Sequence, residues 1–185
     1  PKTAKKLQGF LNINCDKWKD LKDASELTVG SQINKSEILF KKIEDEFVEF
    51  VNISDSCINL SGCKIFDTEN LNNGNANHQF PENSFLSSGK SLIVFGGGTP
   101  NGVFGNALVF VSSNAVMNLN NSGDVMTLTD SLDNIILTFD VEPLSNNPNE
   151  SYTRFPDLTG DFEQHATAFT GVLFSPGTRI DGSTF

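Results

Sequence analysis

The sequence predicts an all-β protein with the architecture of an immunoglobulin-like β-sandwich of about eight or nine strands. From about residue 36 onward, short apolar runs recur at roughly ten-residue intervals, separated by clusters of Gly, Asn, Asp, Ser and Pro. Several runs alternate: Val48 and Phe50 share one face, as in a sheet that is packed on one side and wetter on the other. The helical period is almost absent from this part. The predicted strands are Ile38–Lys42, Phe47–Asn52, Ile58–Leu60, Lys64–Phe66, Ser91–Phe95, Ala107–Val111, Val125–Thr129, Ile135–Val141 and Tyr152–Phe155.

Residues 1–35 differ from the rest and form a predicted N-terminal extension, so the sandwich is expected over residues 36–185. The extension holds most of the lysines and the only tryptophan, Trp18. Asp16–Leu27 has mixed charge and a loosely helical spacing, and a break follows at Gly30. This composition fits a leader helix, a linker from an upstream domain or an extra strand on the sandwich, and the sequence leaves the three open.

The net charge of −10 bears on the partners that we expect. Nucleic-acid affinity draws mainly on Lys and Arg, so an acidic chain of this kind predicts no nucleic-acid partner. No run of about 18 apolar residues exists to span a bilayer, and no signal-peptide pattern is present. The 16 phenylalanines, against one tyrosine and one tryptophan, predict a core filled by Phe.

The three cysteines allow at most one intrachain disulfide, which would leave one thiol over. Cys15, Cys57 and Cys63 fit no zinc-binding spacing. Cys57 and Cys63 lie in apolar, strand-like runs, where a buried free thiol is the expected state.

No catalytic machinery is recognisable, and we expect no catalytic or cofactor-binding residue. Only His78 and His165 could serve as general bases near neutral pH, and neither lies in a metal-binding or nucleophile-elbow motif. Calcium is the one metal alternative, because carboxylates and asparagines cluster in three places, although no calcium-loop motif is present. The three clusters are Asp67–Asn77, Asn120–Asp124 and Asp157–Glu163.

Long polar segments between the predicted strands are the expected binding loops. Asp67–Gln79 is rich in asparagine and has no apolar period, and Glu142–Glu150 is similar, so both are predicted loops. The glycine run after Phe95 is not a phosphate-binding loop, because no Lys-Ser/Thr and no helix follow it. We expect a loop between two strands that could shape a binding edge. The candidate binding residues are Asn72, Asn73, Asn75, His78, Gly96, Gly97 and Gly98.

Five segments follow one another in an order that matches a known family. They are Glu46–Asn52, Asn59–Asp67, Phe80–Val94, Leu119–Asp130 (LNNSGDVMTLTD) and Ser151–Thr178. Together they resemble the lamin tail domain family over residues 37–182. Two positions depart from its pattern, since Cys63 stands where the family usually has Trp or Tyr, and Phe155 fills a slot often held by Trp.

The same motifs predict structural roles. Gly123 can take a positive φ in the turn that precedes the strand at Val125, and Gly62 marks a bend where one strand changes partners. Arg154 is expected to stack on aromatic residues or to pair with Asp157. The residues expected to carry the motif structure are Asn120, Asn121, Gly123, Asp124, Gly62, Arg154, Pro156, Asp157, Pro176 and Gly177.

The resemblance implies an immunoglobulin-like fold and a non-catalytic binding or structural module. In this setting we expect a bacterial envelope or secreted protein that engages a protein or a surface glycan through end loops or a sheet edge. The alternative is an accessory domain of a secreted hydrolase or nuclease. The sequence names neither the partner nor the oligomeric state.

Overall fold

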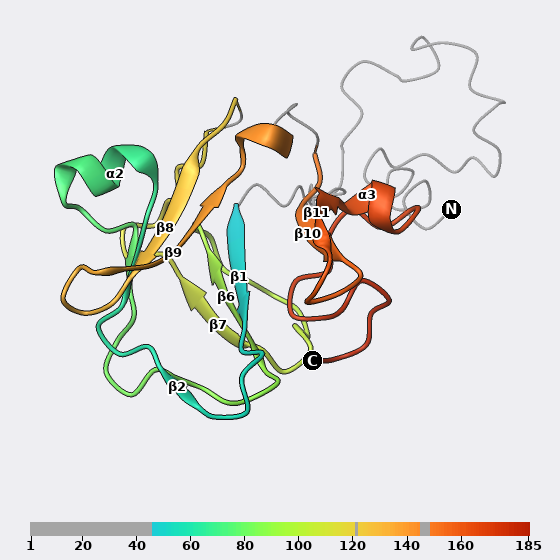
Figure 1. Cartoon of the computed structure of the whole chain (residues 1–185), viewed down its shortest axis with the longest axis horizontal. Helices are drawn as coiled ribbons and strands as arrows, with labels where there is room; N and C mark the ends of the chain where they lie inside the picture. The colour runs from blue at the N-terminus through green and yellow to red at the C-terminus, as the bar shows by residue number, and fades with distance from the viewer. Residues whose placement is uncertain (1–45, 121, 145–148) are drawn as a thin grey trace, which may run out of the picture. The chain divides into compact units, whose positions relative to one another are not determined.

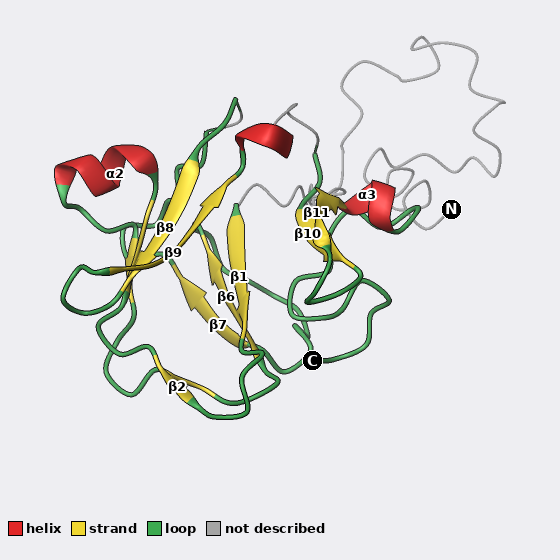
Figure 2. Cartoon of the chain, in the orientation of Figure 1, coloured by secondary structure: helices red, strands yellow, loops and turns green. Residues whose placement is uncertain are grey.

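A computed structural model describes residues 46–120, 122–144 and 149–185 of the chain (Figures 1 and 2). The N-terminal extension, the predicted strand Ile38–Lys42, Cys15 and Asn121 lie outside these residues. The described elements are β1 (Phe47–Val51), β2 (Ile58–Asn59), β3 (Lys64–Phe66), α2 (Thr68–Asn73), β4 (His78–Gln79), β5 (Phe85–Leu86), β6 (Ser91–Phe95), β7 (Leu108–Val111), β8 (Val125–Thr129), β9 (Ile135–Asp140), η3 (Glu142–Leu144), β10 (Tyr152–Phe155), β11 (Asp161–Gln164) and α3 (His165–Ala168).

The described residues confirm the all-β, immunoglobulin-like architecture. One sheet has the strand order β1-β6-β7, and the other has the order β4-β3-β8-β9. Leu92 and Val94 from the first sheet pack in one apolar cluster with Ile65 and Leu128 from the second. Two further pairs, β2 with β5 and β10 with β11, lie outside these sheets. Strands in which apolar and polar residues alternate bury their apolar faces between two packed sheets, and the core has this arrangement here.

Strand β6 is buried along its whole length, unlike the two-faced strands that the alternation predicts. Its inner face, with Leu92 and Val94, joins the core. On the outer face the Phe95 ring lies 5.7 Å from that of Phe47 and 5.3 Å from that of Phe104. The outer face of the neighbouring β1 is also partly covered, because the backbone N–H of Gly177 donates to Glu49 at 3.1 Å. The crossover loop and the C-terminal segment thus supply a partial third layer.

The glycine-rich segment has a topological role in the fold. β6 and β7 pair in parallel, with Leu92 opposite Leu108. Parallel neighbours need a crossover of about a dozen residues, and residues 96–107 provide it. Gly96 lies against the rest of the protein, because a Cβ there would meet the backbone nitrogen of Met117 at 3.0 Å.

The prediction of a continuous loop over Asp67–Gln79 is wrong. The segment forms helix α2 and strand β4. α2 has no buried residue, so its sequence shows no apolar helical period from which the helix could be predicted. Local hydrogen bonds fix the two ends of the helix. Asp67 accepts from the backbone N–H of Asn70 at 2.6 Å, and Gly74 ends the helix in the left-handed conformation.

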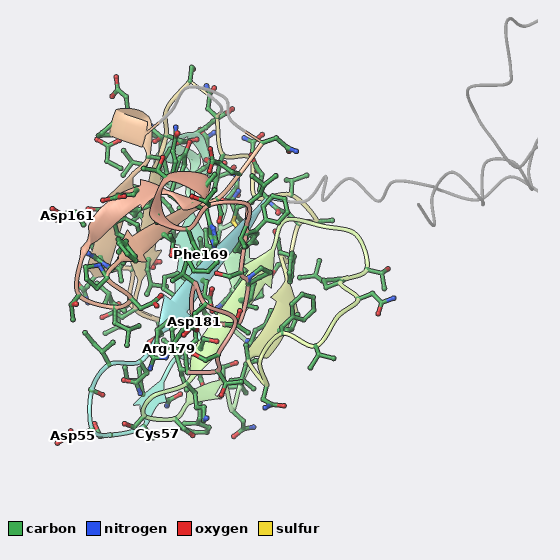
Figure 3. The ribbon with its side chains drawn as sticks, turned by 90° about the vertical axis from the view of Figure 1, so that its right-hand side faces the viewer. Asp55, Cys57, Asp161, Phe169, Arg179 and Asp181 are labelled. Atoms are coloured by element: carbon green, nitrogen blue, oxygen red, sulfur yellow. The ribbon has the colours of Figure 1, made fainter. Side chains whose placement is uncertain are left out.

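Four more elements were not predicted, and one cysteine lies elsewhere than expected. β5, β11 and α3 are short or polar, and η3 lies inside the predicted loop Glu142–Glu150. Cys63 is a buried free thiol as predicted, whereas Cys57 is free but exposed. Cys57 lies in the loop between β1 and β2, close to Asp55, and not within an apolar strand (Figure 3).

Candidate binding surface

The hairpin of β8 and β9 presents the most exposed run of large apolar side chains next to a strand. Leu132 at its tip is 80% exposed, and Ile135, Ile136 and Leu137 at the start of β9 are 62%, 53% and 38% exposed. We call these four residues the β9 edge surface. Successive side chains of a strand point to opposite faces, so Ile136 and Leu137 lie on the two sides of the strand. Several large apolar side chains exposed around one edge are typical of a place where another molecule binds.

β9 is positioned by regular pairing with β8. Met126 lies opposite Phe139 and Leu128 opposite Leu137, and a register shift follows between Leu128 and Thr129. Among the described residues β9 is the last strand of its sheet. Phe139 is fixed from the other side as well, because its ring lies 4.3 Å from that of Phe162 in β11. The exposed large apolar side chains of β9 therefore lie in the half near the hairpin tip, whereas Phe139 is partly covered.

Acidic side chains flank the β9 edge surface at both ends. Asp130 and Asp133 lie in the hairpin turn, and Asp140 and Glu142 follow the apolar run. Hydrogen bonds from the side chain and backbone of Asn134 lower the pKa of Asp130 below its usual 3.8, so it stays charged. Asp133 has a cationic neighbour in Lys64, whose ammonium lies 2.6 Å from its carboxylate. The surface is thus apolar in the middle and acidic at its ends.

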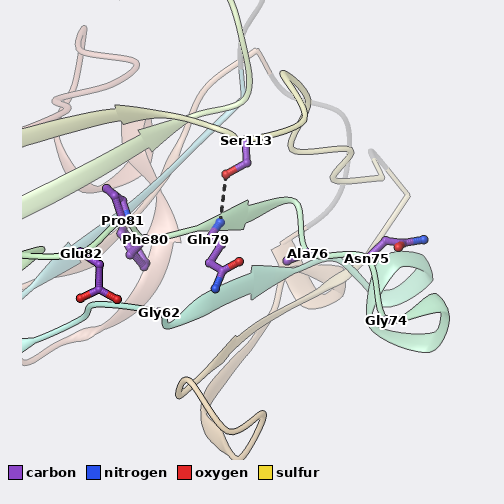
Figure 4. Close-up of a pocket in the computed structure, with 9 residues that line it drawn as sticks. All are labelled: Gly62, Gly74, Asn75, Ala76, Gln79, Phe80, Pro81, Glu82 and Ser113. Atoms are coloured by element: carbon purple, nitrogen blue, oxygen red, sulfur yellow. Dashed lines mark hydrogen bonds between the residues drawn. The ribbon is translucent and has the colours of Figure 1, made fainter.

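The opposite edge of the same sheet is less accessible to another strand. The Ser113 hydroxyl accepts the outward N–H of Gln79 in β4 at 3.1 Å (Figure 4). The Ser112 hydroxyl lies 2.7 Å from the carbonyl of Asn77 and donates to it or to two other nearby acceptors. Because these serines already engage backbone groups of the β4 edge, strand addition there would have to displace them.

An open groove of about 610 Å³ lies beside β4 and extends from Glu82 to Asn75 at the end of α2 (Figure 4). Asn75, predicted as a binding residue, lines it together with Gln79, Glu82 and Ser113. Asn72 and Asn73, predicted with it, lie in the exposed last turn of α2. The groove walls carry amide, hydroxyl and carboxylate groups, so it presents hydrogen-bonding groups beside the apolar side chains of Ala76 and Pro81.

His78, predicted as a binding-loop residue, lies in the core. It is 3% exposed, and its ring packs edge-on against Phe80 with centroids 4.7 Å apart. Nδ1 lies 3.3 Å from the Ser113 hydroxyl, and Nε2 has no hydrogen-bond partner among the described residues. Burial lowers the pKa of His78 from its usual 6.5 to about 4, so the ring is neutral at pH 7. The structure places it as a core side chain.

The predicted loop glycines are only partly accessible. Gly96 and Gly97 are buried, and Gly98 alone of the three is exposed. Gly98 has a φ of 70°, which suits glycine. The run therefore begins the crossover from β6 to β7, and only its distal part faces solvent.

His165 and Ser175 form the hydrogen-bonded pair that most resembles a catalytic dyad. His165 Nε2 lies 2.9 Å from the Ser175 hydroxyl, and Nδ1 lies 2.9 Å from the carbonyl of Val172. The imidazole is 1% exposed, so a substrate has no access to it. The pair joins α3 to the C-terminal segment and is explained as a structural contact.

The carboxylates considered for calcium are engaged in hydrogen bonds within the fold. Asp67 is 1% exposed and accepts from the side-chain amides of Asn70, Asn77 and Asn118 at 3.0–3.1 Å. Asp124 accepts from the Thr68 hydroxyl at 2.6 Å. Within the described ranges, no group of three or more His, Cys, Asp or Glu is arranged to hold a metal ion.

The turn before β8 contains the motif residues Asn120, Gly123 and Asp124. Gly123 has a φ of 126°, and a Cβ there would meet the Glu142 Cβ at 2.9 Å. Asn120 caps its own turn by accepting from the backbone N–H of Ser122 at 3.1 Å. Burial acts to raise the pKa of Asp124, but hydrogen bonds from Thr68, Asn120 and Val125 outweigh it and lower that pKa.

Gly62, named as a motif residue, lies where the chain changes strand partners. β2 before it pairs with β5, whereas β3 after it pairs with β4 and β8. Gly62 has a φ of 78°, and a Cβ there would meet the Ser131 Cβ at 3.0 Å. Glycine is therefore required by both the backbone and the close neighbour.

Arg154 stacks on an aromatic ring and does not contact Asp157. Its guanidinium lies 4.2 Å from the centroid of the Phe162 ring and donates to the carbonyl of Gly160 at 2.7 Å. Asp157 instead accepts the backbone N–H of Ile180 at 3.3 Å. Pro156 follows a cis peptide bond.

Gly177, which follows Pro176, makes a close backbone contact with the crossover loop. A Cβ at Gly177 would overlap the carbonyl of Phe104, and a Cβ at Gly105 would overlap the carbonyl of Gly177. The two glycines permit the C-terminal segment to lie directly on the loop that joins β6 to β7. Together with the Glu49 hydrogen bond, this contact fixes the third layer.

In the part of the chain that the structure describes, no helix has the length and apolar character needed to cross a bilayer.

Comparison with known proteins agrees with the fold. A 49-residue stretch is 41% identical to part of the methionine–tRNA ligase of Phocaeicola vulgatus, covering 26% of this chain and 7% of that enzyme. So short a stretch says nothing about the activity of the whole ligase. The family model of the lamin tail domain matches residues 24–142, well over half of the chain. The chain therefore belongs to the lamin tail domain family, whose members are non-enzymatic, immunoglobulin-like domains.

Proposed function

We propose that the chain is a binding module of a bacterial envelope or secreted protein and that it engages a protein partner through the β9 edge surface. The observation that carries this proposal is the exposure of Leu132, Ile135 and Ile136 on an edge hairpin, at 80%, 62% and 53%. Burying such side chains supplies the main driving force for protein association.

The chemistry of the groove along β4 favours a protein over a glycan as the partner. Glycan sites offer aromatic faces beside hydrogen-bonding groups. The polar groove along β4 contains the Phe80 ring, but that ring is 1% exposed and offers no such face. The β9 edge surface has aliphatic side chains, which suit the apolar centre of a protein interface.

The net charge of −10 and the abundance of exposed asparagine support a well-solvated module of an envelope or secreted protein. The bacterial source of the matched ligase stretch supports the bacterial setting. Fractionation of the cells of origin, followed by immunodetection of the untagged chain, tests the location. We expect the protein in the envelope or the medium, and recovery from the cytoplasm alone would contradict this part of the proposal.

Photocrosslinking in the cells of origin tests the binding function. A photoreactive phenylalanine analogue replaces Leu132 in the full chain, and the same analogue replaces Ile53, which is 73% exposed in the loop after β1, as the matched control. We expect a protease-sensitive adduct that is specific to position 132. Equal adducts at both positions, or an adduct that resists protease and contains glycan, would contradict the proposal.

A further inference from the structure

The backbone of β9 offers unused hydrogen-bonding directions on the side away from β8. The N–H of Val141 donates to the carbonyl of Asp124 at 2.9 Å. In an antiparallel pair the bonded residues alternate, so Phe139 and Leu137 have the same orientation as Val141. The backbone N–H and C=O of Thr138 therefore point away from β8. Among the described residues no strand pairs with β9 on that side.

β9 has one charge at its end, Asp140, and a register shift near its start, but the strand between them is unprotected. Natural edge strands carry Lys, Pro or inward-pointing charges, or are very short, because an open edge pairs readily with another strand. The five residues Ile135–Phe139 contain no charge and no proline, and four of them are large and apolar. β4 at the other end of the sheet has only two residues, and hydroxyls already engage it. Of the two edges of this sheet, β9 is therefore the one more open to strand addition.

The charges at the two ends of β9 distinguish between possible occupants. In an antiparallel pair of two β9 strands, the end near Asp133 of one copy would meet the end near Asp140 of the other. Like charges placed opposite each other destabilise a strand pair, and two chains of net charge −10 also repel each other at long range. A strand with basic ends would instead meet opposite charge at both ends.

We propose that β9 binds an extended segment of a partner protein by strand addition, and that this segment has an apolar, β-branched centre with Lys or Arg at both ends. The inference rests on the proposed function and specifies the partner chemistry for the same surface. The backbone groups of Thr138 pair with the added strand. The side chains of Ile135 and Ile136 contact its apolar centre, and Asp133 and Asp140 attract its basic ends.

The test uses the full chain and two fluorescein-labelled peptides that share the centre TVIVT. One peptide has two lysines at each end, and the other has two glutamates at each end. Fluorescence anisotropy should show that the lysine-flanked peptide binds at least about ten-fold more tightly. Equal binding of the two peptides, or no binding of the lysine-flanked peptide at millimolar protein, would overturn the proposal.

Three variants locate the site. Thr138→Pro removes the outward N–H, and Ile136→Lys places a cation beside the basic peptide; each should weaken binding at least about ten-fold. Ile53→Lys, the matched control on the loop after β1, should bind like the unaltered chain. Circular dichroism checks folding, and if Thr138→Pro does not fold, Ile136→Lys decides alone. Unchanged binding by folded Ile136→Lys overturns the strand-addition proposal. A specific adduct at position 132 in that case would leave the proposed function standing.

Discussion

Glu49 shows how a single residue of the sequence acquires an unusual environment from the fold. It is a half-buried carboxyl between β6 and the C-terminal segment. Burial raises its pKa from the usual 4.5 to about 7, although hydrogen bonds from Ser91 and Gly177 act in the opposite direction. Because the folded-state pKa lies above the unfolded one, the stability linked to protonation is fully present below pH 4.5. It is lost as the pH rises through about 7.

Glu49→Gln should therefore stabilise the protein at high pH. The amide keeps an acceptor for Gly177 but carries no charge to desolvate. At pH 8 we expect the free energy of unfolding to rise by on the order of 1–3 kcal/mol, and at pH 4 we expect little change. Urea unfolding at the two pH values measures this. Glu82→Gln, on an exposed carboxyl, is the control and should change stability at neither pH. A variant less stable than the unaltered chain at pH 8 would contradict this account of Glu49.

Asp67 is the residue on which the α2 region depends. Its carboxylate caps the helix and accepts the side-chain amides of Asn77 and Asn118. Asp67→Ala would leave buried amides without acceptors, and we expect a loss of on the order of 3 kcal/mol in the free energy of unfolding. Asp133→Ala is the matched control. Its carboxylate is 61% exposed and pairs only at the surface, so the loss should stay below about 1 kcal/mol. Similar losses in urea unfolding of both variants would show that the buried network contributes little.

At the scale of the elements, the strands with clear alternation are predictable and the capped or very short elements are not. β1, β6, β8 and β9 follow from apolar runs bounded by turn residues. α2 has no apolar face, and only its caps could have revealed it, Asp67 at the start and Gly74 at the end. β4 and β5 have two residues each, too few to show a period. Their strand geometry depends on neighbours that are distant in sequence.

The candidate site, too, was only partly predictable from the sequence. Ile135–Val141 is predicted as a strand, but the sequence alone does not say that this strand lies at the end of a sheet. Its exposure is a tertiary property, so the prediction of binding through end loops or a sheet edge named candidate residues in the long loops and none on this strand. A local signal was available, namely three consecutive large aliphatic residues after an acidic turn. His78 illustrates the converse, because a residue in a polar segment is drawn into the core by β4 pairing.

The contact between the C-terminal segment and the crossover loop provides a third prediction. Gly177→Ala would place a methyl group against the Phe104 carbonyl at a φ of 81°, whereas Gly171→Ala meets open space at a φ of 88°. Both variants lose about 1 kcal/mol of stability because alanine is strained in the left-handed conformation. Only Gly177→Ala must also push the C-terminal segment away from the crossover loop. We expect it to lose at least about 2 kcal/mol more in urea unfolding. Equal losses would show that the close contact does not contribute to stability.

For the whole molecule, the acidic charge makes association dependent on ionic strength. Asp133 and Asp140 lie at the surface, and the total charge of −10 adds a long-range attraction for basic partners. The affinity for the lysine-flanked peptide should fall several-fold between about 0.05 and 0.5 M salt, because the Debye length shortens over this range. Anisotropy titrations with NaCl measure the fall. An affinity that rises with salt would indicate a purely apolar contact.

The central claim is that this lamin tail domain binds its partner along β9. Hydrogen–deuterium exchange of the full chain, with and without the lysine-flanked peptide, tests it most directly. We predict added protection confined to Ile135–Asp140, greatest at the Thr138 amide, with no change along β4. Protection along Gln79 and Ser113 in place of β9, or no protection under saturating peptide, would contradict the claim.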